Sequence, residues 1–551
     1  MTDRKTAEAW KEAVVYQVYP RSFMDSNGDG IGDLAGIIGK LDYLQQLGVN
    51  LLWLSPVYRS PMDDNGYDIS SYEDIAEVFG TLQEMERLIA EAKVRDMGIL
   101  MDLVVNHTSD EHPWFLEALK STNSPYRDFY IWRKPAADGG PPNDFRSYFG
   151  GSGWTFDIAS GEYYFHQFSK RQPDLNWDNP QVREEVHAMM NRWLDKGISG
   201  FRMDVIDLIG KDVDRQVMVN GKNLHQFIHQ MNRATFGHRD CVTVGETWSA
   251  TPEDALLYSA EQREELSMVF QFEHIKLFWD EHDGKWCNKP FDLLRFKEVI
   301  DKWQRALAHQ GWNSLFWSNH DLPRAVSRFG DDGRYRVASA KMLATALHCL
   351  KGTPYIYQGE EIGMTNVRFA SIDDYRDIES LNLYRERTEA GVSDAQMMEG
   401  IYANGRDNAR TPMQWDNSPH AGFTQGTPWI AANPNYQQVN VAAALACPDS
   451  IFFHYQKLVA LRKKLPLLVH GDFQQIFADH PQVFGWLRRF NGQTLVVINN
   501  FTPEPVTLDV PEAMQGKQGT CLITNSSPRV RLPASLELQP FESFALLLER
   551  S

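Results

Sequence analysis

The chain lacks long hydrophobic runs and has fewer positive than negative charges. No stretch of about 18 apolar residues occurs among its 551 residues, so we expect no membrane-spanning helix. Lys and Arg total 55 against 73 Asp and Glu, which gives a net charge of −18. This balance argues against nucleic acid or an anionic membrane surface as a partner.

Cysteines are also scarce, and no two of them form a C-x-x-C pair. The five are Cys241, Cys287, Cys349, Cys447 and Cys521. An odd number at wide spacing predicts neither a disulfide framework nor a zinc site, and scattered free thiols suit a reducing cytosol. The polar N-terminus, residues 1–11, has no apolar segment of the kind found in signal peptides. We therefore expect a cytoplasmic protein.

What the chain does contain is a repeating succession of short apolar runs and amphipathic helical segments. Helices are expected at 41–47, 81–95 and 182–196. Eight buried strands are expected at 14–19, 51–54, 99–107, 200–206, 242–246, 268–272, 314–317 and 353–357. Strands that alternate with helices favour a parallel sheet. We predict an α/β fold, a (β/α)8 TIM barrel.

The alternation is interrupted twice and then stops. Residues 1–107 and 177–466 carry the barrel, and residues 108–176 are too long and too rich in Gly, Pro and aromatics for a loop. We predict a small inserted domain there, after the third strand. Residues 366–435 form a long polar excursion after the eighth strand, and residues 467–551 read as short strands alone. The last segment predicts a separate antiparallel β domain.

Three expected strands end in a carboxylate: Asp204, Glu246 and Asp321. In a barrel these side chains would meet in one pocket at the carboxyl ends of the strands. Glycoside hydrolysis needs two such groups, and a third can stabilise positive charge on the sugar ring. Arg202 lies two residues before Asp204 and shares its face, so we expect it to keep Asp204 ionised. A purely structural Arg–Asp pair at a strand end is the alternative.

An oxygen-rich loop follows the first strand. In the segment Asp25-Ser-Asn-Gly-Asp-Gly-Ile-Gly-Asp33, oxygen-bearing side chains recur at every second position, separated by glycines. This pattern is typical of a calcium site, although the twelfth position, where an EF-hand carries Glu, is Gly36. A polar loop of Asx turns without a metal is the alternative.

Four segments in order resemble the signature regions of the alpha-amylase family, glycoside hydrolase family 13. They are Asp102-Leu-Val-Val-Asn-His107, Gly200-Phe-Arg-Met-Asp204, Glu246 and Asn319-His-Asp321. Gln172-Pro-Asp-Leu-Asn176 is similar to a further motif of the oligo-1,6-glucosidase subfamily. The resemblance covers nearly the whole chain, including the inserted and C-terminal domains.

The resemblance implies a retaining mechanism, with Asp204 as nucleophile, Glu246 as acid/base and Asp321 as stabiliser of the distorted sugar. It also implies that an Asp64–Arg406 pair closes the pocket and enforces exo action. The residues that would bind the terminal glucose are Asp64, Tyr67, His107, Arg202, His320 and Arg406. The implied calcium ligands are Asp25, Asn27, Asp29, the carbonyl of Ile31, and Asp33.

Val205 directly follows the candidate nucleophile. In the family that this chain resembles, valine at this position goes with specificity for α-1,6 linkages. Its branched side chain would narrow the aglycone side, unless it is simply a good strand residue. We therefore predict an exo-acting α-glucosidase, expected to be a monomer, that cleaves α-1,6-linked short saccharides such as isomaltose, with isomaltulose or trehalulose as further substrates.

Three alternatives remain open. A sucrose isomerase of this family would carry Arg-Leu-Asp-Arg-Asp after the sixth strand, where this chain has Lys276-Leu-Phe-Trp-Asp280. A trehalose-6-phosphate hydrolase would need basic residues at the pocket mouth. A catalytically inactive relative acting as a binding protein would not need the three carboxylates that are present here.

Overall fold

The computed structural model describes residues 9–549. Residues 1–8 and 550–551, and with them most of the N-terminal segment considered above, lie outside the described part. Within residues 9–549, no helix combines the length and the apolar character that crossing a membrane requires.

Eight parallel strands form the central sheet, in the spatial order β11-β10-β9-β5-β2-β1-β13-β12. An isolated parallel bridge between Val269 and Asn313 joins the two outer strands and closes the barrel. All eight strands are almost wholly buried, as expected where helices cover a barrel. They are β1 (Val15–Val18), β2 (Leu51–Leu54), β5 (Gly98–Leu103), β9 (Gly200–Met203), β10 (Val242–Glu246), β11 (Met268–Phe270), β12 (Ser314–Leu315) and β13 (Thr353–Tyr357).

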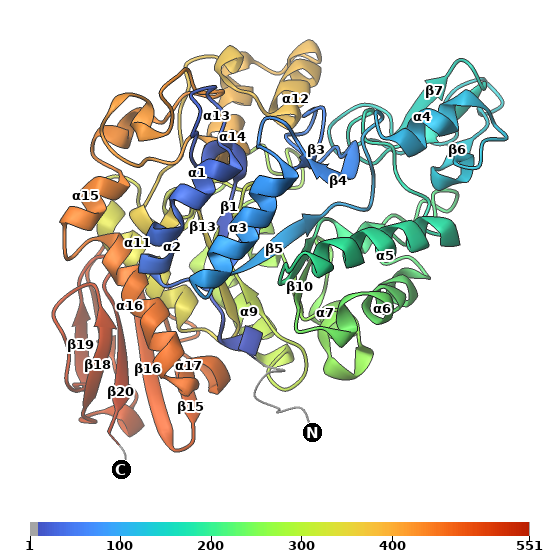
Figure 1. Cartoon of the computed structure of the whole chain (residues 1–551). Helices are drawn as coiled ribbons and strands as arrows, with labels where there is room; N and C mark the ends of the chain where they lie inside the picture. The colour runs from blue at the N-terminus through green and yellow to red at the C-terminus, as the bar shows by residue number, and fades with distance from the viewer. Residues whose placement is uncertain (1–8, 550–551) are drawn as a thin grey trace.

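Helices surround this barrel (Figure 1). Their ends follow local rules: Thr81 and Glu84 form a capping box on α3, and Asn179 caps α5 ahead of Pro180. The surrounding helices are α2 (Leu41–Leu47), α3 (Leu82–Val94), α5 (Pro180–Asp195), α6 (Leu224–Ala234), α7 (Pro252–Ser259), α9 (Leu293–Ala306), α11 (Arg336–His348) and α16 (Ile451–Lys464).

Five of the eight barrel strands end earlier than the sequence predicts, and β5 and β12 show why. β5 ends at Leu103, because the chain beyond it pairs with the inserted segment: Leu175 N donates to Asn106 O at 2.9 Å. β12 ends at Leu315, and the chain then turns so that Asp321 N donates to Asn319 Oδ1 at 2.7 Å. Polar residues expected at strand ends therefore lie on turns beyond them.

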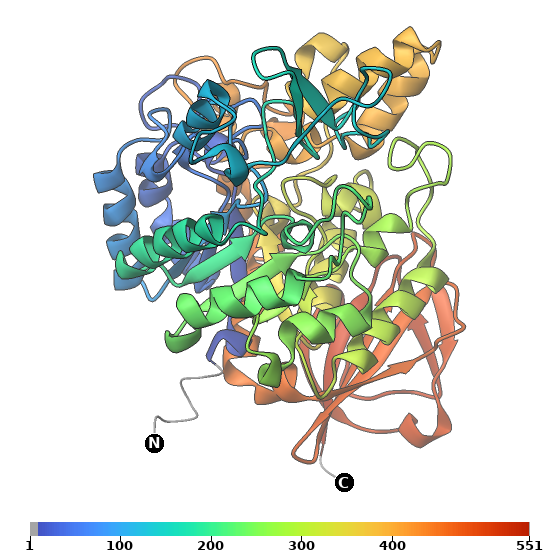
Figure 2. The ribbon, with the colours of Figure 1, turned by 90° about the vertical axis from the view of Figure 1, so that its right-hand side faces the viewer.

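Two segments rise above the same end of the barrel. Residues 108–176 hold α4 (Pro113–Lys120) and a three-stranded antiparallel sheet of β6 (Trp132–Arg133), β8 (Glu162–Phe165) and β7 (Trp154–Asp157). The excursion after β13 contains α12 (Ile378–Glu389), α13 (Asp394–Asn404) and α14 (Asp407–Arg410). Figures 1 and 2 show both segments at the top of the molecule, where they flank the carboxyl ends of the barrel strands.

The C-terminal strands pack against the barrel helices, away from that end (Figure 1). Trp486 Nε1 and Arg488 Nη1 donate to Cys349 O, just after α11, at 3.1 and 2.8 Å. The larger antiparallel sheet runs in the order β14 (Asp472–Ile476), β15 (Val483–Phe490), β16 (Gln493–Asn500), β20 (Ser543–Leu548) and β18 (Gly519–Thr524), beside the pair β17 (Val506–Asp509) and β19 (Ser535–Leu538).

Candidate active site

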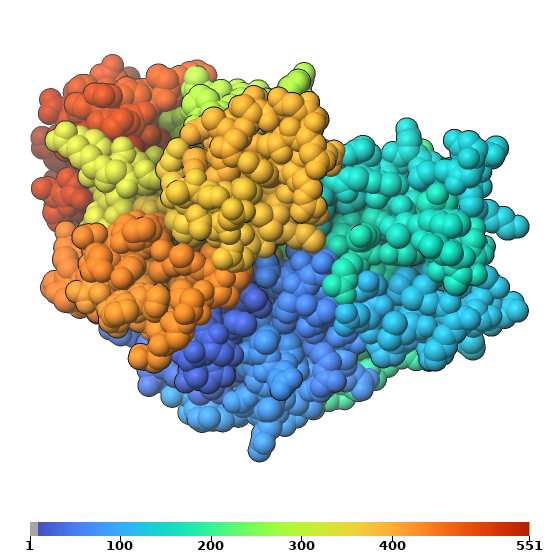
Figure 3. Space-filling view, turned by 90° about the horizontal axis from the view of Figure 1, so that it is seen from above, coloured from blue at the N-terminus to red at the C-terminus, as the bar shows by residue number. Residues whose placement is uncertain are grey.

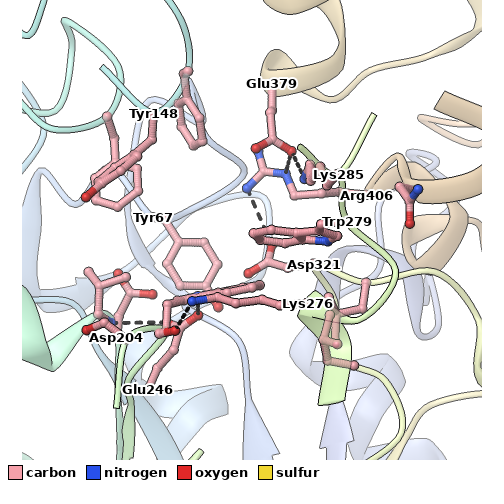
Figure 4. A pocket seen from close by; sticks show the side chains of 18 of the residues that line it. Tyr67, Tyr148, Asp204, Glu246, Lys276, Trp279, Lys285, Asp321, Glu379 and Arg406 are labelled. Atoms are coloured by element: carbon pink, nitrogen blue, oxygen red, sulfur yellow. Dashed lines mark hydrogen bonds and ion pairs between the residues drawn. The ribbon is translucent and has the colours of Figure 1, made fainter. Parts of the chain in front are cut away.

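A cavity of about 420 Å³ opens at the carboxyl ends of the barrel strands. Seen from above, the inserted segment and the α12–α13 excursion meet over this end (Figure 3). Asp204, Glu246 and Asp321, the three carboxylates expected to converge, all line the cavity (Figure 4). Strands β9 and β10 and the turn beyond β12 carry them there. The barrel thus brings together side chains that lie 42 to 117 residues apart in the sequence.

One buried guanidinium organises three carboxylates. Arg202 Nη1 donates to Asp204 Oδ1 and to Asp102 Oδ1, both at 2.9 Å, and its Nη2 donates to Glu246 Oε2 at 2.6 Å. The side chain of Arg202 is 1 % exposed. A single positive charge shared by three carboxyl groups cannot neutralise them all, so this cluster favours retention of a proton.

This sharing corrects the expectation that Arg202 keeps Asp204 ionised. Burial raises the pKa of Asp204 well above its ordinary value, and the charges of Glu246 and Asp102 add to the increase. Arg202 lowers that pKa, but by less than the opposing effects together. The pKa of Asp102 is raised to about 6, also chiefly by burial. In the resting pocket, then, Asp204 does not behave as an isolated, permanently charged carboxylate.

Glu246 receives three N–H groups. Besides Arg202 Nη2, the main-chain N of Val205 donates to Oε2 at 3.1 Å, and the indole Nε1 of Trp248 donates to Oε1 at 2.8 Å. Both carboxyl oxygens are therefore held in place. The sequence marked Glu246 but not Trp248, two residues later, although a Trp next to a candidate acid was a readable signal.

Val205 does not lie in a strand, contrary to the strand reading of this position. β9 ends at Met203, and Val205 has φ 35° and ψ 45°, in the left-handed region that branched residues rarely adopt. The turn presents its main-chain N to Glu246 and places Val205 in the cavity wall beside Asp204. Strain of this kind persists where surrounding contacts hold it, and it clusters at functional sites.

Asp321 is held by two arginines. Arg410 Nη2 donates to its Oδ1 at 2.8 Å, and Arg406 Nη1 approaches the same oxygen at 3.4 Å. Burial alone would raise the pKa of Asp321, but the positive charges outweigh burial and hold it below its ordinary range. The arginines carry this effect at neutral pH, because burial lowers the pKa of the neighbouring His320 to about 3 and leaves it neutral. Asp321 is therefore a charged carboxylate.

Arg406 also closes the far wall of the cavity. Its Nη2 donates to Asp64 Oδ1 at 3.1 Å and to Asp377 Oδ1 at 2.6 Å. Burial raises the pKa of Asp64 to about 7, although Arg406 and Arg410 act against it. Asp377 was missed in the sequence, because nothing in the polar stretch before α12 distinguishes it from its acidic neighbours.

The remaining predicted sugar-binding residues lie beside this wall. Tyr67 donates its hydroxyl to Asp102 Oδ2 at 2.9 Å and stacks on His320, with ring centroids 5.2 Å apart. His107 Nε2 lies 3.0 Å from Tyr67 O, and burial lowers the pKa of His107 to about 4. Both histidines are neutral near pH 7, and both ring nitrogens of His107 already have polar partners, since Nδ1 lies 3.1 Å from Asn106 Nδ2.

The opposite side of the cavity consists largely of rings. Trp248 stacks on Phe272 with centroids 3.8 Å apart and lies 5.6 Å from Trp279. Lys285 forms an ion pair with Glu379 at the same mouth, on the side of the excursion (Figure 4). The sequence did not predict these residues, because loops at separate strand ends supply them.

The predicted calcium loop is a chain of turns that point side-chain oxygens at main-chain amides. Asp25 Oδ1 accepts from Asn27 N at 3.0 Å, Asn27 Oδ1 from Asp29 N at 3.1 Å, and Asp29 Oδ1 from Ile31 N at 2.9 Å. Asp33 Oδ1 caps α1 (Leu34–Gly39) through Gly36 N. Across residues 9–549, no three His, Cys, Asp or Glu side chains gather as a metal site. A cation here would need Asn and carbonyl oxygens as well.

Comparisons with known proteins agree with this geometry. The family model for the alpha amylase catalytic domain matches residues 17–471, and the model for the maltogenic amylase C-terminal domain matches residues 473–544. A palatinase of Erwinia rhapontici is 75% identical over 98% of this chain and 99% of its own. An oligo-1,6-glucosidase of Bacillus cereus is 53% identical over 98% and 99%.

Solved structures of related enzymes also match over nearly the whole chain. An isomaltulose synthase from Erwinia rhapontici NX5 superimposes with a TM-score of 0.95 at 41% identity, covering 98% of this chain and 99% of that one. Trehalose-6-phosphate hydrolase from Bacillus licheniformis gives a TM-score of 0.93 at 46% identity, again over 98% and 99%. Relatives of this fold therefore carry several disaccharide chemistries.

Proposed function

Because this chain belongs to the alpha-amylase family of glycoside hydrolases, we propose that it is a retaining, exo-acting α-glucosidase that releases glucose from α-1,6-linked short saccharides. The observation that carries the proposal is the pair Asp204 and Glu246 on one guanidinium. Two carboxyl groups that share one guanidinium lie close together. This suits the retaining mechanism, in which the two groups are about 5–5.5 Å apart, better than the inverting mechanism, in which a water must fit between them.

The two half-reactions follow from these positions. Asp204 attacks the anomeric carbon while the bond to the aglycone oxygen breaks and Glu246 gives that oxygen its proton. Glu246 then takes a proton from water, whose oxygen attacks the same carbon and releases Asp204. Asp321, charged and anchored by Arg410, stabilises the positive charge that develops on the ring. The pair needs one proton overall, and burial together with the crowding of three carboxyl groups around one guanidinium favours that state.

Exo action is supported by the closed wall. Arg406 joins Asp64 to Asp377 beyond the position of the first sugar, and Gln172 Nε2 also donates to Asp64 at 3.1 Å. A chain of sugars cannot continue through this wall, so only a terminal glucose fits. The five free cysteines support a reducing compartment such as the cytoplasm.

Hydrolysis is favoured over isomerisation by the segment after β11. This stretch, where a sucrose isomerase carries two arginines, contains α8 (Glu273–Lys276) and the following Leu-Phe-Trp-Asp280. A phosphorylated aglycone is less well supported, because two cations of the cavity lining are engaged: Lys276 Nζ donates to Trp248 O at 2.5 Å, and Lys285 pairs with Glu379. A third, Arg328, lies over the ring of Phe278. The intact carboxylates argue against an inactive binding protein.

A product assay tests the proposal. The purified protein would be offered isomaltose, isomaltulose, trehalulose, sucrose, maltose and trehalose 6-phosphate, and the products would be separated by chromatography. We expect free glucose from isomaltose and from isomaltulose or trehalulose, with the α anomer formed first. Conversion of sucrose to isomaltulose would establish an isomerase instead, and preference for trehalose 6-phosphate would establish the phosphosugar hydrolase.

We further propose that the Asp25–Asp33 loop binds calcium as a structural ion. Its carboxylate, amide and carbonyl oxygens are hard ligands, and a bound ion would replace some of the donors on Asp25, whose two carboxylate oxygens each accept two hydrogen bonds. The loop is also fastened to the segment before residue 430, because Thr424 Oγ1 donates to Asp25 Oδ2 at 2.6 Å. A bound ion would stabilise this junction rather than take part in chemistry.

The ion should raise the melting temperature by mass action without changing kcat. Protein loaded with calcium, as verified by metal analysis, would be compared with protein treated with chelator. The exposed Asp29 offers a matched variant, since Asp29→Asn removes one charge but preserves the oxygen that accepts from Ile31 N. The variant should show a smaller calcium-dependent shift, and an unchanged melting temperature after calcium removal would rule the site out.

A further inference from the structure

The three N–H groups that donate to the Glu246 carboxyl group belong to three different kinds of group. Arg202 divides its guanidinium among three carboxyl groups, and Val205 donates through a main-chain amide whose place the turn fixes. Trp248 donates from a side chain, to the other carboxyl oxygen, at 2.8 Å. It is the one donor of the three that reaches Oε1 and that a substitution can remove without changing the backbone or the Arg202 cluster.

Contacts on all sides hold the indole in this position. Its ring lies nearly parallel to that of Phe272, at 9°, and at 22° to that of Trp279. Lys276 on α8 donates to the carbonyl of the same residue, and Ser249, next in the chain, donates to Asp207 Oδ2 at 3.0 Å. The Trp248 N–H is therefore aimed at Glu246 by packing from β10, α8 and the turn after β9.

The charged groups around Glu246 leave the indole a distinct role. Those that face Glu246 or its partners are Arg202, Asp204, Asp102, Asp207, Lys276 and Asp321. Four of these are carboxyl groups, and each resists a further negative charge on Glu246. A neutral donor that favours the charged carboxylate offsets this resistance without adding a cation that would attract the other acids.

We propose that Trp248 is a positioning residue for Glu246, whose indole N–H holds the Oε1 oxygen and sets how readily Glu246 releases and regains its proton. The inference rests on the proposed function, in which Glu246 gives a proton to the leaving oxygen and later takes one from water. An N–H donor stabilises the charged form, which promotes release in the first step and prepares the base for the second.

The test is the pH profile of kcat/KM, which reports the free enzyme that the structure describes. Trp248→Phe keeps an aromatic ring for stacking but removes the N–H. Loss of the donor removes a hydrogen bond to the charged carboxylate, so the alkaline limb for isomaltose should move to higher pH. p-Nitrophenyl α-glucoside, whose leaving group needs little protonation, should show the same alkaline limb in variant and wild type.

Trp279→Phe is the matched control. Trp279 lines the same cavity and stacks on Trp248, but among the described residues its indole donates no hydrogen bond to Glu246. The control should keep the wild-type alkaline limb. If Trp248→Phe fails to fold, benzothienylalanine at position 248 replaces the N–H by sulfur with the ring shape retained, and the same shift is expected.

The outcomes separate the two proposals. An inactive wild type on isomaltose would refute the proposed function before any variant is compared. An active wild type whose profile coincides with that of Trp248→Phe would refute only the role of Trp248. An equal shift in Trp279→Phe would also refute it, because the effect would then come from aromatic bulk rather than from the N–H.

Discussion

The two ends of the pocket are built from different materials. The glucose end is a buried network of charges, in which Arg406 holds Asp64 and Asp377 and Arg410 holds Asp321. The aglycone end is a wall of rings, in which Trp248 stacks on Phe272 and lies against Trp279.

The difference predicts where selectivity lies. A site built to hydrogen-bond a substrate hydroxyl lowers kcat/KM by roughly 10⁴–10⁵-fold for an analogue that lacks this hydroxyl. One methylene more or less in an apolar pocket changes kcat/KM by only about 10–200-fold. The glucose end should therefore accept only a glucose residue, whereas the aglycone end should accept several different second sugars. Substitutions at the two ends can test this contrast, beginning with the largest expected effect.

Asp204→Asn should reduce kcat/KM by roughly 10⁴-fold or more, because an amide cannot attack the anomeric carbon. The side-chain volume hardly changes, so the melting temperature should stay close to that of the wild type. A fluorinated glucosyl reagent should label Asp204 in the wild type, and mass spectrometry would locate the label. A label on any other residue would show that the nucleophile is wrongly assigned.

Arg406→Met should be the most damaging change at the glucose end outside the carboxylates. It leaves Asp64 and Asp377 buried without their cation, and breaking a buried pair costs about 3–5 kcal/mol. We expect a large fall in both the free energy of unfolding and kcat/KM for every glucoside. Arg376→Met is a suitable control, since Arg376 is partly exposed and its guanidinium contacts main-chain carbonyls. Similar losses in both variants would contradict the prediction.

Val205 lies at the junction of the two ends, so its effect should depend on linkage. An α-1,6 linkage has an extra rotatable carbon and can swing the second sugar away from this side chain, whereas an α-1,4 linkage cannot. Val205→Ala and Val205→Thr should raise kcat/KM for maltose relative to isomaltose by about tenfold. An unchanged ratio in both variants would place the selectivity in the loops of the ring-lined wall.

The smallest effect concerns the neutral histidines of the glucose end. Burial lowers the pKa of His320 to about 3, below that of an unfolded chain, so the unfolded state binds more protons as the pH falls below about 6.5. Stability is then fully present at neutral pH and lost toward acid.

His320→Gln should therefore remove roughly 1 kcal/mol of the decrease in unfolding free energy between pH 7 and pH 5.5. Urea denaturation at both pH values measures it. His282, whose side chain is 92% exposed, provides the control: His282→Gln should keep the wild-type dependence. Equal pH dependence in wild type and His320→Gln would mean that His320 is not the source.

The sequence by itself determined the barrel and the chemistry of its end. Apolar runs alternating with helices encode burial on both faces, and this local information specified eight parallel strands in order. Polar residues directly after those runs had to lie at one end of the barrel, which is why Asp204, Glu246 and Asp321 could be placed together. The order of the four signature motifs along the chain then indicated the family.

Only the tertiary structure decided how those groups affect one another. Asp64 and Arg406 are 342 positions apart, and the family resemblance rather than any local pattern implied their pairing. The second partner of Arg406, Asp377, emerged only from the structure. The same holds for the sharing of Arg202, which the pairing of β9 with β5 and β10 imposes on three carboxylates. The left-handed turn at Val205 is likewise invisible in a strand-like sequence, because surrounding contacts rather than the propensity of valine hold it there.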